Sequence, residues 1–349
     1  MSIFDQKVIK YEMKPLSSLE KVFPDETPVY RMECQMLSGL WGETVSFQVA
    51  YTGDFVMRER LDVRVVSELA EHVHVRTVEM VPVGRATNGI VDDNYLKTTS
   101  GLYPDLLKDL KDGKVIVYSR QWRSLWVDVD ITNEIPAGEY EIELQLIKEG
   151  EVVCSAKQKV TVIGTELPKL DIMHTEWMHA DCLADYYHVE VFSEEHWKLL
   201  ENYFQEYVKR DCNMMLTPLF TSPLDTAIGL ERTTCQLIDV EVKDGEYVFG
   251  FEKLKRWIDL CKKCGIEYFE MSHLFSQWGA KYAPKVVATV NGKKEKIFGW
   301  HTPAVGEYTK FLESFLPQLT AKLRKWEIAD VTYFHISDEP REEHLESYK

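Results

Sequence analysis

The spacing of apolar residues changes in character near Pro168. Before this point apolar and polar residues mostly alternate, which is the period of a β-strand with one buried face. After it, apolar residues recur every three or four positions in long stretches separated by short apolar runs, which is typical of helices alternating with strands. The change predicts two domains, residues 1–168 and 169–349, and the length of 349 residues agrees with two domains of ordinary size.

The first domain is predicted to be an antiparallel β-sandwich. In residues 138–146, four apolar side chains share a face opposite three glutamates. A turn at 148–151 and a second alternating run at 152–162 predict a hairpin. Similar alternating runs occur at residues 43–50, 61–66, 73–81 and 125–131. Many short strands without a long helical stripe are typical of a sandwich.

The second domain is predicted to alternate strands with helices. Helical stripes follow Ser193, run from Phe251 to a stop at Gly265, and extend over residues 305–326. Apolar strand candidates occupy residues 170–174, 212–216, 265–271 and 329–336. This order, with strands that are apolar throughout, predicts a parallel sheet buried on both faces.

Four strands and three helices amount to half of a (β/α)₈ TIM barrel. A complete barrel takes roughly 250 residues, whereas about 180 residues follow Pro168. We therefore predict a truncated (β/α)₈ domain that consists of the first half of the barrel. An open four-stranded doubly wound sheet is the alternative, because periodicity alone does not separate the two architectures.

Charge and composition narrow the classes of partner. With 41 Lys and Arg against 57 Asp and Glu, the net charge of −16 disfavours binding to nucleic acid or to an anionic membrane surface. No apolar run approaches the roughly 18 residues of a membrane span, and the N-terminus lacks a signal-peptide pattern, so a cytoplasmic location is predicted. Seven cysteines, an odd number, fit a reducing compartment.

No metal or other cofactor is predicted. Cys261 and Cys264 have the spacing of a zinc or redox pair, but they lie at the end of a helix, where the dipole disfavours thiolate. No second pair of this kind completes four ligands. His72 and His74 share a strand face, an arrangement that can bind metal but is more often simply solvated.

Acids, imidazoles and indoles follow the predicted parallel strands. In parallel α/β architectures the carboxyl ends of the strands meet at one rim, where ligands bind. Carboxyl groups for proton transfer and aromatic faces for a pyranose are what sugar cleavage needs. The candidates for substrate binding are Trp177, His179, Asp181, His273, Trp278, Trp300 and His335. Core packing is the alternative role for the three tryptophans. His335 lies on the same strand face as Glu339 and can orient it, and a core histidine is the alternative for this residue.

Asp338, Glu339 and Pro340 form the sharpest local motif. Neighbouring carboxyls repel when both are ionised, so one is expected to hold a proton and leave an acid beside a base. Pro340 favours an extended backbone at Glu339. Adjacent residues of a regular strand point to opposite faces, so both carboxyls reach one ligand only if the chain twists or bulges there. The alternative is that the pair begins a loop and caps a following helix.

Together, residues 177–187, 189–197 and 334–340 resemble glycoside hydrolase family 123, and residues 42–49 are similar to the N-terminal β-sandwich of that family. The resemblance implies a retaining exo-β-N-acetylgalactosaminidase or β-N-acetylhexosaminidase that uses substrate-assisted, oxazoline catalysis without a cofactor. It implies that Asp338 accepts a hydrogen bond from the acetamido N–H of the substrate and that Glu339 is the general acid and base. The implied partner is a glycan or glycoside with a terminal N-acetylhexosamine.

The chain departs from the family pattern in ending at Lys349, where family members continue through the rest of the barrel. We therefore expect poor hydrolysis of 4-nitrophenyl N-acetyl-β-galactosaminide and an apolar edge left exposed on the fourth strand. One alternative is a two-carboxylate retaining barrel glycosidase with its nucleophile on a missing strand. Another is a non-catalytic carbohydrate-binding protein.

Overall fold

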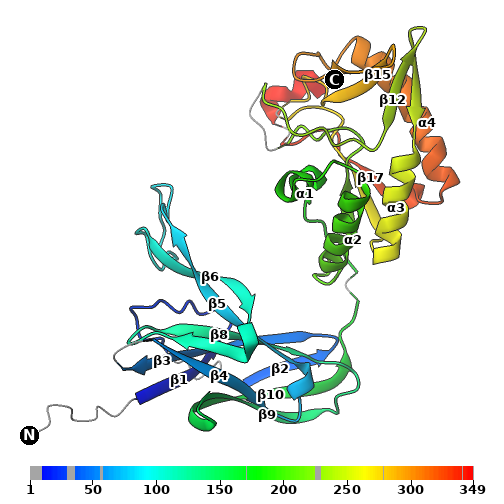
Figure 1. Cartoon of the computed structure of the whole chain (residues 1–349). Coiled ribbons are helices and arrows are strands. Elements are labelled where there is room, and N and C mark those ends of the chain that lie inside the picture. Colours follow the sequence, from blue (N-terminus) through cyan, green and yellow to red (C-terminus); the bar gives the residue numbers. More distant parts are fainter. Residues whose placement is uncertain are drawn as a thin grey trace, which may run out of the picture. The chain divides into compact units, whose positions relative to one another are not determined.

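A computed structural model describes residues 10–29, 36–55, 58–169, 171–224, 229–277, 279–339 and 341–348. The chain divides into two compact units, residues 1–169 and 170–349 (Figure 1).

Within the described residues, the first unit contains two five-stranded sheets. One has the order β1 (Lys10–Ser17), β3 (Thr44–Asp54), β8 (Arg123–Asp130), β5 (Val73–Val83) and β6 (Gly101–Asp109). The other has the order β2 (Met36–Trp41), β10 (Glu151–Glu166), β9 (Gly138–Lys148), β4 (Glu59–Val66) and β7 (Lys114–Val117). Two short 3₁₀ turns, η2 (Ala70–His72) and η3 (Lys111–Gly113), lie between strands. The prediction of antiparallel sheets is confirmed except at one pair, because β2 runs parallel to β10.

The core of this unit lies between the two sheets. Phe47 of β3 and Leu125 of β8 belong to the same buried cluster as Ile142 and Leu144 of β9 and Val160 of β10. The alternation in the sequence therefore identified the inward face of the β9–β10 hairpin correctly.

The second unit contains four α-helices and two small sheets within its described residues. The helices are α1 (Ala180–Tyr187), α2 (Glu194–Val208), α3 (Glu252–Cys264) and α4 (Glu307–Lys325), with 3₁₀ turns η4 (Ala329–Val331) and η5 (Glu342–Tyr348). One sheet is formed by β11 (Met214–Thr217), β14 (Tyr268–Met271) and β17 (Thr332–Phe334). The other has the order β13 (Glu246–Gly250), β12 (Asp239–Lys243), β15 (Val286–Val290) and β16 (Lys293–Phe298). No described helix is both long enough and apolar enough to cross a bilayer.

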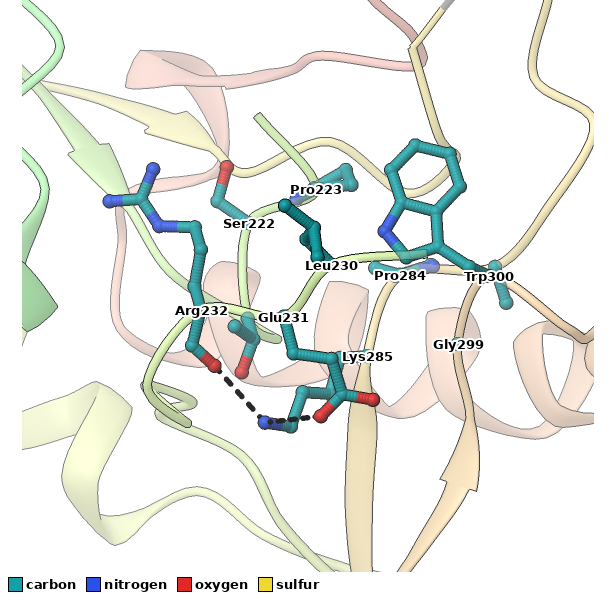
Figure 2. Close-up of a pocket in the computed structure, with 11 residues that line it drawn as sticks. Ser222, Pro223, Leu230, Glu231, Arg232, Pro284, Lys285, Gly299 and Trp300 are labelled. Atoms are coloured by element: carbon teal, nitrogen blue, oxygen red, sulfur yellow. Dashed lines mark hydrogen bonds and ion pairs between the residues drawn. The ribbon is translucent and has the colours of Figure 1, made fainter. Parts of the chain in front are cut away.

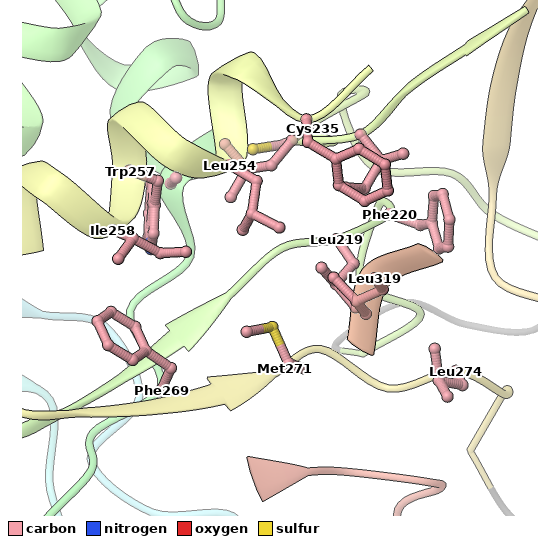
Figure 3. Close-up of a cluster of buried hydrophobic side chains, with 14 of the residues drawn as sticks. Leu219, Phe220, Cys235, Leu254, Trp257, Ile258, Phe269, Met271, Leu274 and Leu319 are labelled. Atoms are coloured by element: carbon pink, nitrogen blue, oxygen red, sulfur yellow. The ribbon is translucent and has the colours of Figure 1, made fainter. Parts of the chain in front are cut away.

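The predicted helix ends are confirmed by their caps. The hydroxyl of Ser193 accepts a hydrogen bond from the backbone N–H of His196 at 3.2 Å, which satisfies one free donor at the start of α2. Gly265 ends α3 with a φ of +101°, a left-handed conformation that favours glycine. Trp257 and Leu254 of α3 belong to the same buried cluster as Phe269 and Met271 of β14 (Figure 3).

The parallel sheet follows the chain order. β11 pairs with β14 and β14 pairs with β17, in each case in parallel. Consecutive strands of a (β/α)₈ barrel are arranged in this way, whereas a doubly wound sheet reverses its order at a switch point. The strand order therefore favours the half-barrel, and the truncated TIM barrel as a whole stays a prediction.

The predicted first strand at residues 170–174 is wrong. Residues 171–174 do not form a strand, and pairing with β11 is limited to a parallel bridge between Thr175 and Met214, while Leu170 lies outside the described residues. The side chain of Asn213 replaces ladder bonds here, because its Nδ2 donates to the carbonyl of Ile172 at 2.9 Å and its Oδ1 accepts from the N–H of His174 at 2.8 Å.

β17 lies at one edge of the described sheet and exposes apolar side chains. Tyr333 and Phe334 are 41% and 40% exposed, and Ile336 beyond the strand is 49% exposed. The apolar edge expected for the fourth strand is therefore present in the described residues.

Candidate active site

The carboxyl ends of the parallel strands lie at one rim, and their pairing continues beyond the strands. The N–H of His335 donates to the carbonyl of Met271 at 3.3 Å, and the N–H of Leu274 donates to the carbonyl of His335 at 3.3 Å. The segment after β14 therefore runs beside the segment after β17. This continuation brings the side chains of His273 and His335 together.

Trp177, His273 and His335 form an aromatic cluster at this rim, which we call the Trp177 cluster. The two imidazole rings are stacked, with centroids 3.8 Å apart and planes inclined by 30°. The Trp177 ring meets both edgewise, at 5.3 Å from His273 and 5.4 Å from His335. Trp177 is 37% exposed whereas His273 is 1% exposed. The cluster therefore combines a solvent-accessible indole with a buried imidazole.

The buried carboxylate of Glu270 holds the cluster in place. It accepts hydrogen bonds from Nε1 of Trp177 at 3.1 Å and from the hydroxyl of Thr175 at 3.3 Å, and its other oxygen lies 2.8 Å from Nδ1 of His335. Sequence reasoning missed Glu270. The available signal was an acid in the otherwise apolar stretch at residues 268–271, a position where a charge needs partners.

His273 is neutral in this setting. Burial lowers the pKa of its imidazole from 6.5 to about 3, with smaller contributions from the positive charges that His335 and His179 carry when protonated. Neither ring nitrogen has a hydrogen-bond partner among the described residues. The ring therefore presents an unsatisfied donor and an unsatisfied acceptor inside the site.

Asp338 reaches the same cluster. Its Oδ2 accepts a hydrogen bond from Nε2 of Gln277 at 3.1 Å, and its side chain is half-buried. One ligand atom each from His273, His335 and Asp338 lie within 4.8 Å of one another. This set of two imidazoles and a carboxylate has the chemistry of a metal site as well as that of a sugar site.

Glu339 follows Asp338 in an unusual backbone conformation. Its φ is +48°, so the extended conformation predicted from Pro340 is wrong, and Pro340 itself lies outside the described residues. β17 ends at Phe334, so the strict alternation of a strand no longer applies at residues 338 and 339. The Glu339 side chain is 57% exposed and its Oε2 lies 3.7 Å from the guanidinium of Arg341.

Asp181 forms a buried ion pair with Arg232. Arg232 donates two hydrogen bonds to its carboxylate, at 2.8 and 3.1 Å, and both side chains are at most 10% exposed. Each oxygen of Asp181 accepts one of these two hydrogen bonds, and the substrate-binding role of this residue stays a prediction. His179 precedes α1 as its N-cap residue and is half-buried.

Trp300 lines another pocket. Together with Ser222, Pro284 and Lys285 it borders a cavity of about 20 Å³ (Figure 2), which holds about one water molecule and no pyranose. Its ring contact within the described part of the chain is with Tyr282, at 6.3 Å. Trp278 lies outside the described residues.

At the rim of the parallel half-barrel, two adjacent carboxyls lie beside an exposed indole, two stacked imidazoles and a buried acid. Carboxyls for proton transfer next to an aromatic face are typical of a glycoside hydrolase. The family is glycoside hydrolase family 123. Residues 177–349 match the family model described as "Glycoside hydrolase 123, catalytic domain", so this part of the chain belongs to that family. The resemblance stated from the sequence is thereby confirmed.

A solved structure supports the fold of the whole chain. The structure titled "The details of glycolipid glycan hydrolysis by the structural analysis of a family 123 glycoside hydrolase from Clostridium perfringens" is similar over 97% of this chain, with a TM-score of 0.71 and 14% identity. The match covers 60% of that structure, so the chain spans less than two thirds of its length.

Two further solved structures have TM-scores too low to inform the fold of this chain. A β-glucosidase from Listeria innocua in complex with isofagomine is similar over 46% of this chain and 17% of its own, with a TM-score of 0.22 and 10% identity. The N-terminal domain of PorA is similar over 42% of this chain and 99% of its own, with a TM-score of 0.22 and 11% identity. No curated protein matches the chain closely enough to count as a relative.

Proposed function

We propose that the chain acts on terminal β-linked N-acetylhexosamine, with N-acetylgalactosamine as the preferred sugar, by retaining, substrate-assisted hydrolysis. The observation that carries the proposal is the placement of Asp338 beside His273 and His335 of the Trp177 cluster, directly before the exposed carboxylate of Glu339 in the chain. The exposed Trp177 ring supplies an apolar face for the pyranose.

Asp338 accepts a hydrogen bond from the acetamido N–H of the bound sugar. Gln277 holds one of its oxygens, which leaves the other for the substrate. The hydrogen bond orients the acetamido carbonyl oxygen toward the anomeric carbon and stabilises the positive charge that develops on the amide. The carbonyl oxygen forms a bond to the anomeric carbon while the bond to the departing oxygen breaks, which gives an oxazolinium ion.

Glu339 transfers the protons. It protonates the departing oxygen in the first step and then removes a proton from the water that attacks the anomeric carbon. The attack opens the oxazoline, restores the acetamido group and retains the configuration of the sugar. Exposure of Glu339 suits this role, because the leaving group and the water both arrive from solvent.

Binding of a stable oxazoline mimic is the first test. The thiazoline analogue of N-acetylgalactosamine should bind to the chain, and calorimetry should show binding weakened about tenfold or more in Asp338→Asn, corresponding to at least about 1.4 kcal/mol. Exchange of the exposed Glu342 for Gln is the matched control and should leave binding unchanged. Equal affinity of the wild type and Asp338→Asn would contradict the role of Asp338.

Turnover provides the second test. Any hydrolysis of 4-nitrophenyl glycosides should be confined to N-acetyl-β-hexosaminides, with the galactosaminide cleaved fastest. It should be absent with the matched β-galactoside, which lacks the participating amide. In Glu339→Gln, substrates with poorer leaving groups should lose more activity than the 4-nitrophenyl substrate, because they depend more on protonation. Cleavage of the plain galactoside would instead favour the alternative with a protein nucleophile. Sugar binding with no turnover of any substrate would favour the non-catalytic alternative.

A further inference from the structure

Two strand ends place three metal-binding side chains together. His273 follows β14, and His335 and Asp338 follow β17, with one ligand atom from each within 4.8 Å of the other two. Two imidazoles and one carboxylate, with a further coordination position left to water, are the ligand set of open zinc sites. Imidazole also suits other late first-row divalent ions.

The state of His273 is a second, independent observation. Its side chain is 1% exposed, and neither ring nitrogen meets a hydrogen-bond partner among the described residues. Buried polar side chains in native proteins nearly always have partners, so an unpartnered buried imidazole calls for a ligand. Because the ring is stacked on His335, a ligand bound by one imidazole lies within reach of the other.

The surroundings of His335 prepare one of its nitrogens for a metal ion. Oε2 of Glu270 accepts hydrogen bonds from Trp177 and Thr175, and Oε1 lies 2.8 Å from Nδ1 of His335. Because a carboxylate accepts hydrogen bonds, Nδ1 of His335 is the donor here. The acceptor nitrogen of this ring is then Nε2. A carboxylate that fixes the tautomer of a histidine in this way is the usual outer partner of a metal-binding imidazole.

From this juxtaposition we propose that His273, His335 and Asp338 bind one zinc-like divalent ion, which competes with the N-acetyl sugar for Asp338. Zinc bonds of about 2.0–2.1 Å place tetrahedral ligand atoms about 3.4 Å apart, so the ion draws the three groups together by rotation of side chains. The competition rests on the proposed function, whereas the metal binding does not. The negative charges of Glu270 and Asp338 favour a cation at this position.

Titration of the tag-free full chain with Co²⁺ alone tests the site, because the visible absorption of Co²⁺ reports its ligands. One equivalent should bind and should be displaced by Zn²⁺. Asp338→Asn and His335→Gln should each weaken binding at least tenfold. Glu270→Gln, which alters only the outer partner, should weaken it about ten- to a hundredfold.

Two controls separate this site from adventitious binding. Glu339→Gln changes the adjacent carboxylate without removing a proposed ligand, so it should retain Co²⁺ binding. The double variant His72→Gln, His74→Gln removes the pair on the other unit and should also retain it. Absence of a specific equivalent in the wild type, or binding that is unchanged in Asp338→Asn, would overturn the proposal.

Competition distinguishes the two proposals. Saturation with the thiazoline analogue should weaken Zn²⁺ binding by at least tenfold if both ligands use Asp338. Retained Zn²⁺ affinity in the saturated protein would overturn the shared position of the sugar while supporting an independent metal site. Loss of metal binding in every titration, with thiazoline binding intact, would overturn the metal site and leave the proposed function supported.

Discussion

Glu270 and His335 form the hydrogen-bonded pair on which the geometry of the site depends. Oε1 of Glu270 lies 2.8 Å from Nδ1 of His335, and Oε2 accepts a hydrogen bond from Nε1 of Trp177 at 3.1 Å. A residue of β14 thereby fixes one aromatic side chain that follows β17 and one that follows the bridge at Thr175. The carboxylate is buried, so each of these bonds lies in an environment of low dielectric, where it is strong and where its loss is costly.

Replacement of Glu270 by Gln should destabilise the second unit. The amide has one acceptor oxygen for several donors, and its NH₂ group faces the donors that the carboxylate satisfied. We expect the free energy of unfolding to fall by about 1–3 kcal/mol. Urea unfolding followed by circular dichroism measures this change. The exposed Glu295→Gln should remain within about 0.5 kcal/mol of the wild type, and equal stability of the two variants would contradict the structural role of Glu270.

The Asp181–Arg232 pair should behave as a buried ion pair. Its side chains are 9% and 10% exposed, so Asp181→Asn or Arg232→Gln alone leaves a buried charge without its partner. Each single variant should lose about 3–5 kcal/mol of stability, and the double variant should lose less than the sum of the two. For comparison, Glu194→Gln at the exposed pair with Arg256 should cost about 1 kcal/mol at most. Additive losses in the double variant would count against a coupled pair.

Stability should fall on acidification because of His196. Its Nδ1 accepts from the N–H of Phe192 at 2.9 Å and its Nε2 donates to the carbonyl of Ala180 at 3.0 Å, so a second proton has no acceptor. Burial lowers the pKa of His196 below 6.5, although hydrogen bonding to Ala180 and the charge of Asp181 oppose the shift. The unfolded chain therefore binds more protons just below pH 6.5, and the contribution of His196 to stability is present above that pH and lost below it.

Thermal unfolding at pH 7.5 and pH 5.5 measures this dependence. The midpoint temperature of unfolding should be lower at pH 5.5 than at pH 7.5. This difference should be smaller in His196→Gln than in the wild type. The exposed His301→Gln is the control and should keep the full dependence of the wild type. An unchanged pH dependence in His196→Gln would show that other groups cause it.

Local signals in the sequence predicted α2, α3 and α4 but missed the short helix α1 (Ala180–Tyr187). Ser193 and Gly265 marked helix ends because capping depends on the residue itself and its near neighbours. The turn at residues 148–151, with φ values of +53° at Glu149 and +90° at Gly150, likewise gave the predicted hairpin of β9 and β10. In each case the physical cause lies within a few residues of the chain.

Long-range partners were not accessible in the same way. The side chain of Asn213 forms hydrogen bonds to the backbone of residues 172 and 174, where a strand ladder was predicted. No local sequence pattern predicts these hydrogen bonds. The pairing of Asp181 with Arg232, 51 residues away, also has no local signature in the sequence. The left-handed backbone at Glu339 also depends on the loop around it, and it overrides the preference of a residue before proline.

Trp177 should contribute more to sugar binding than Trp300. Its ring is 37% exposed at the Trp177 cluster, whereas Trp300 borders a cavity of about 20 Å³. Trp177→Ala removes the apolar face and should weaken binding of the thiazoline analogue about ten- to a hundredfold, or about 1.4–2.8 kcal/mol. Trp177→Phe keeps a ring and loses only the hydrogen bond to Glu270, so a loss of about fivefold is expected. Trp300→Ala is the matched control, and calorimetry should give it an affinity within about twofold of the wild type. A larger loss in Trp300→Ala than in Trp177→Ala would move the sugar platform to the other pocket.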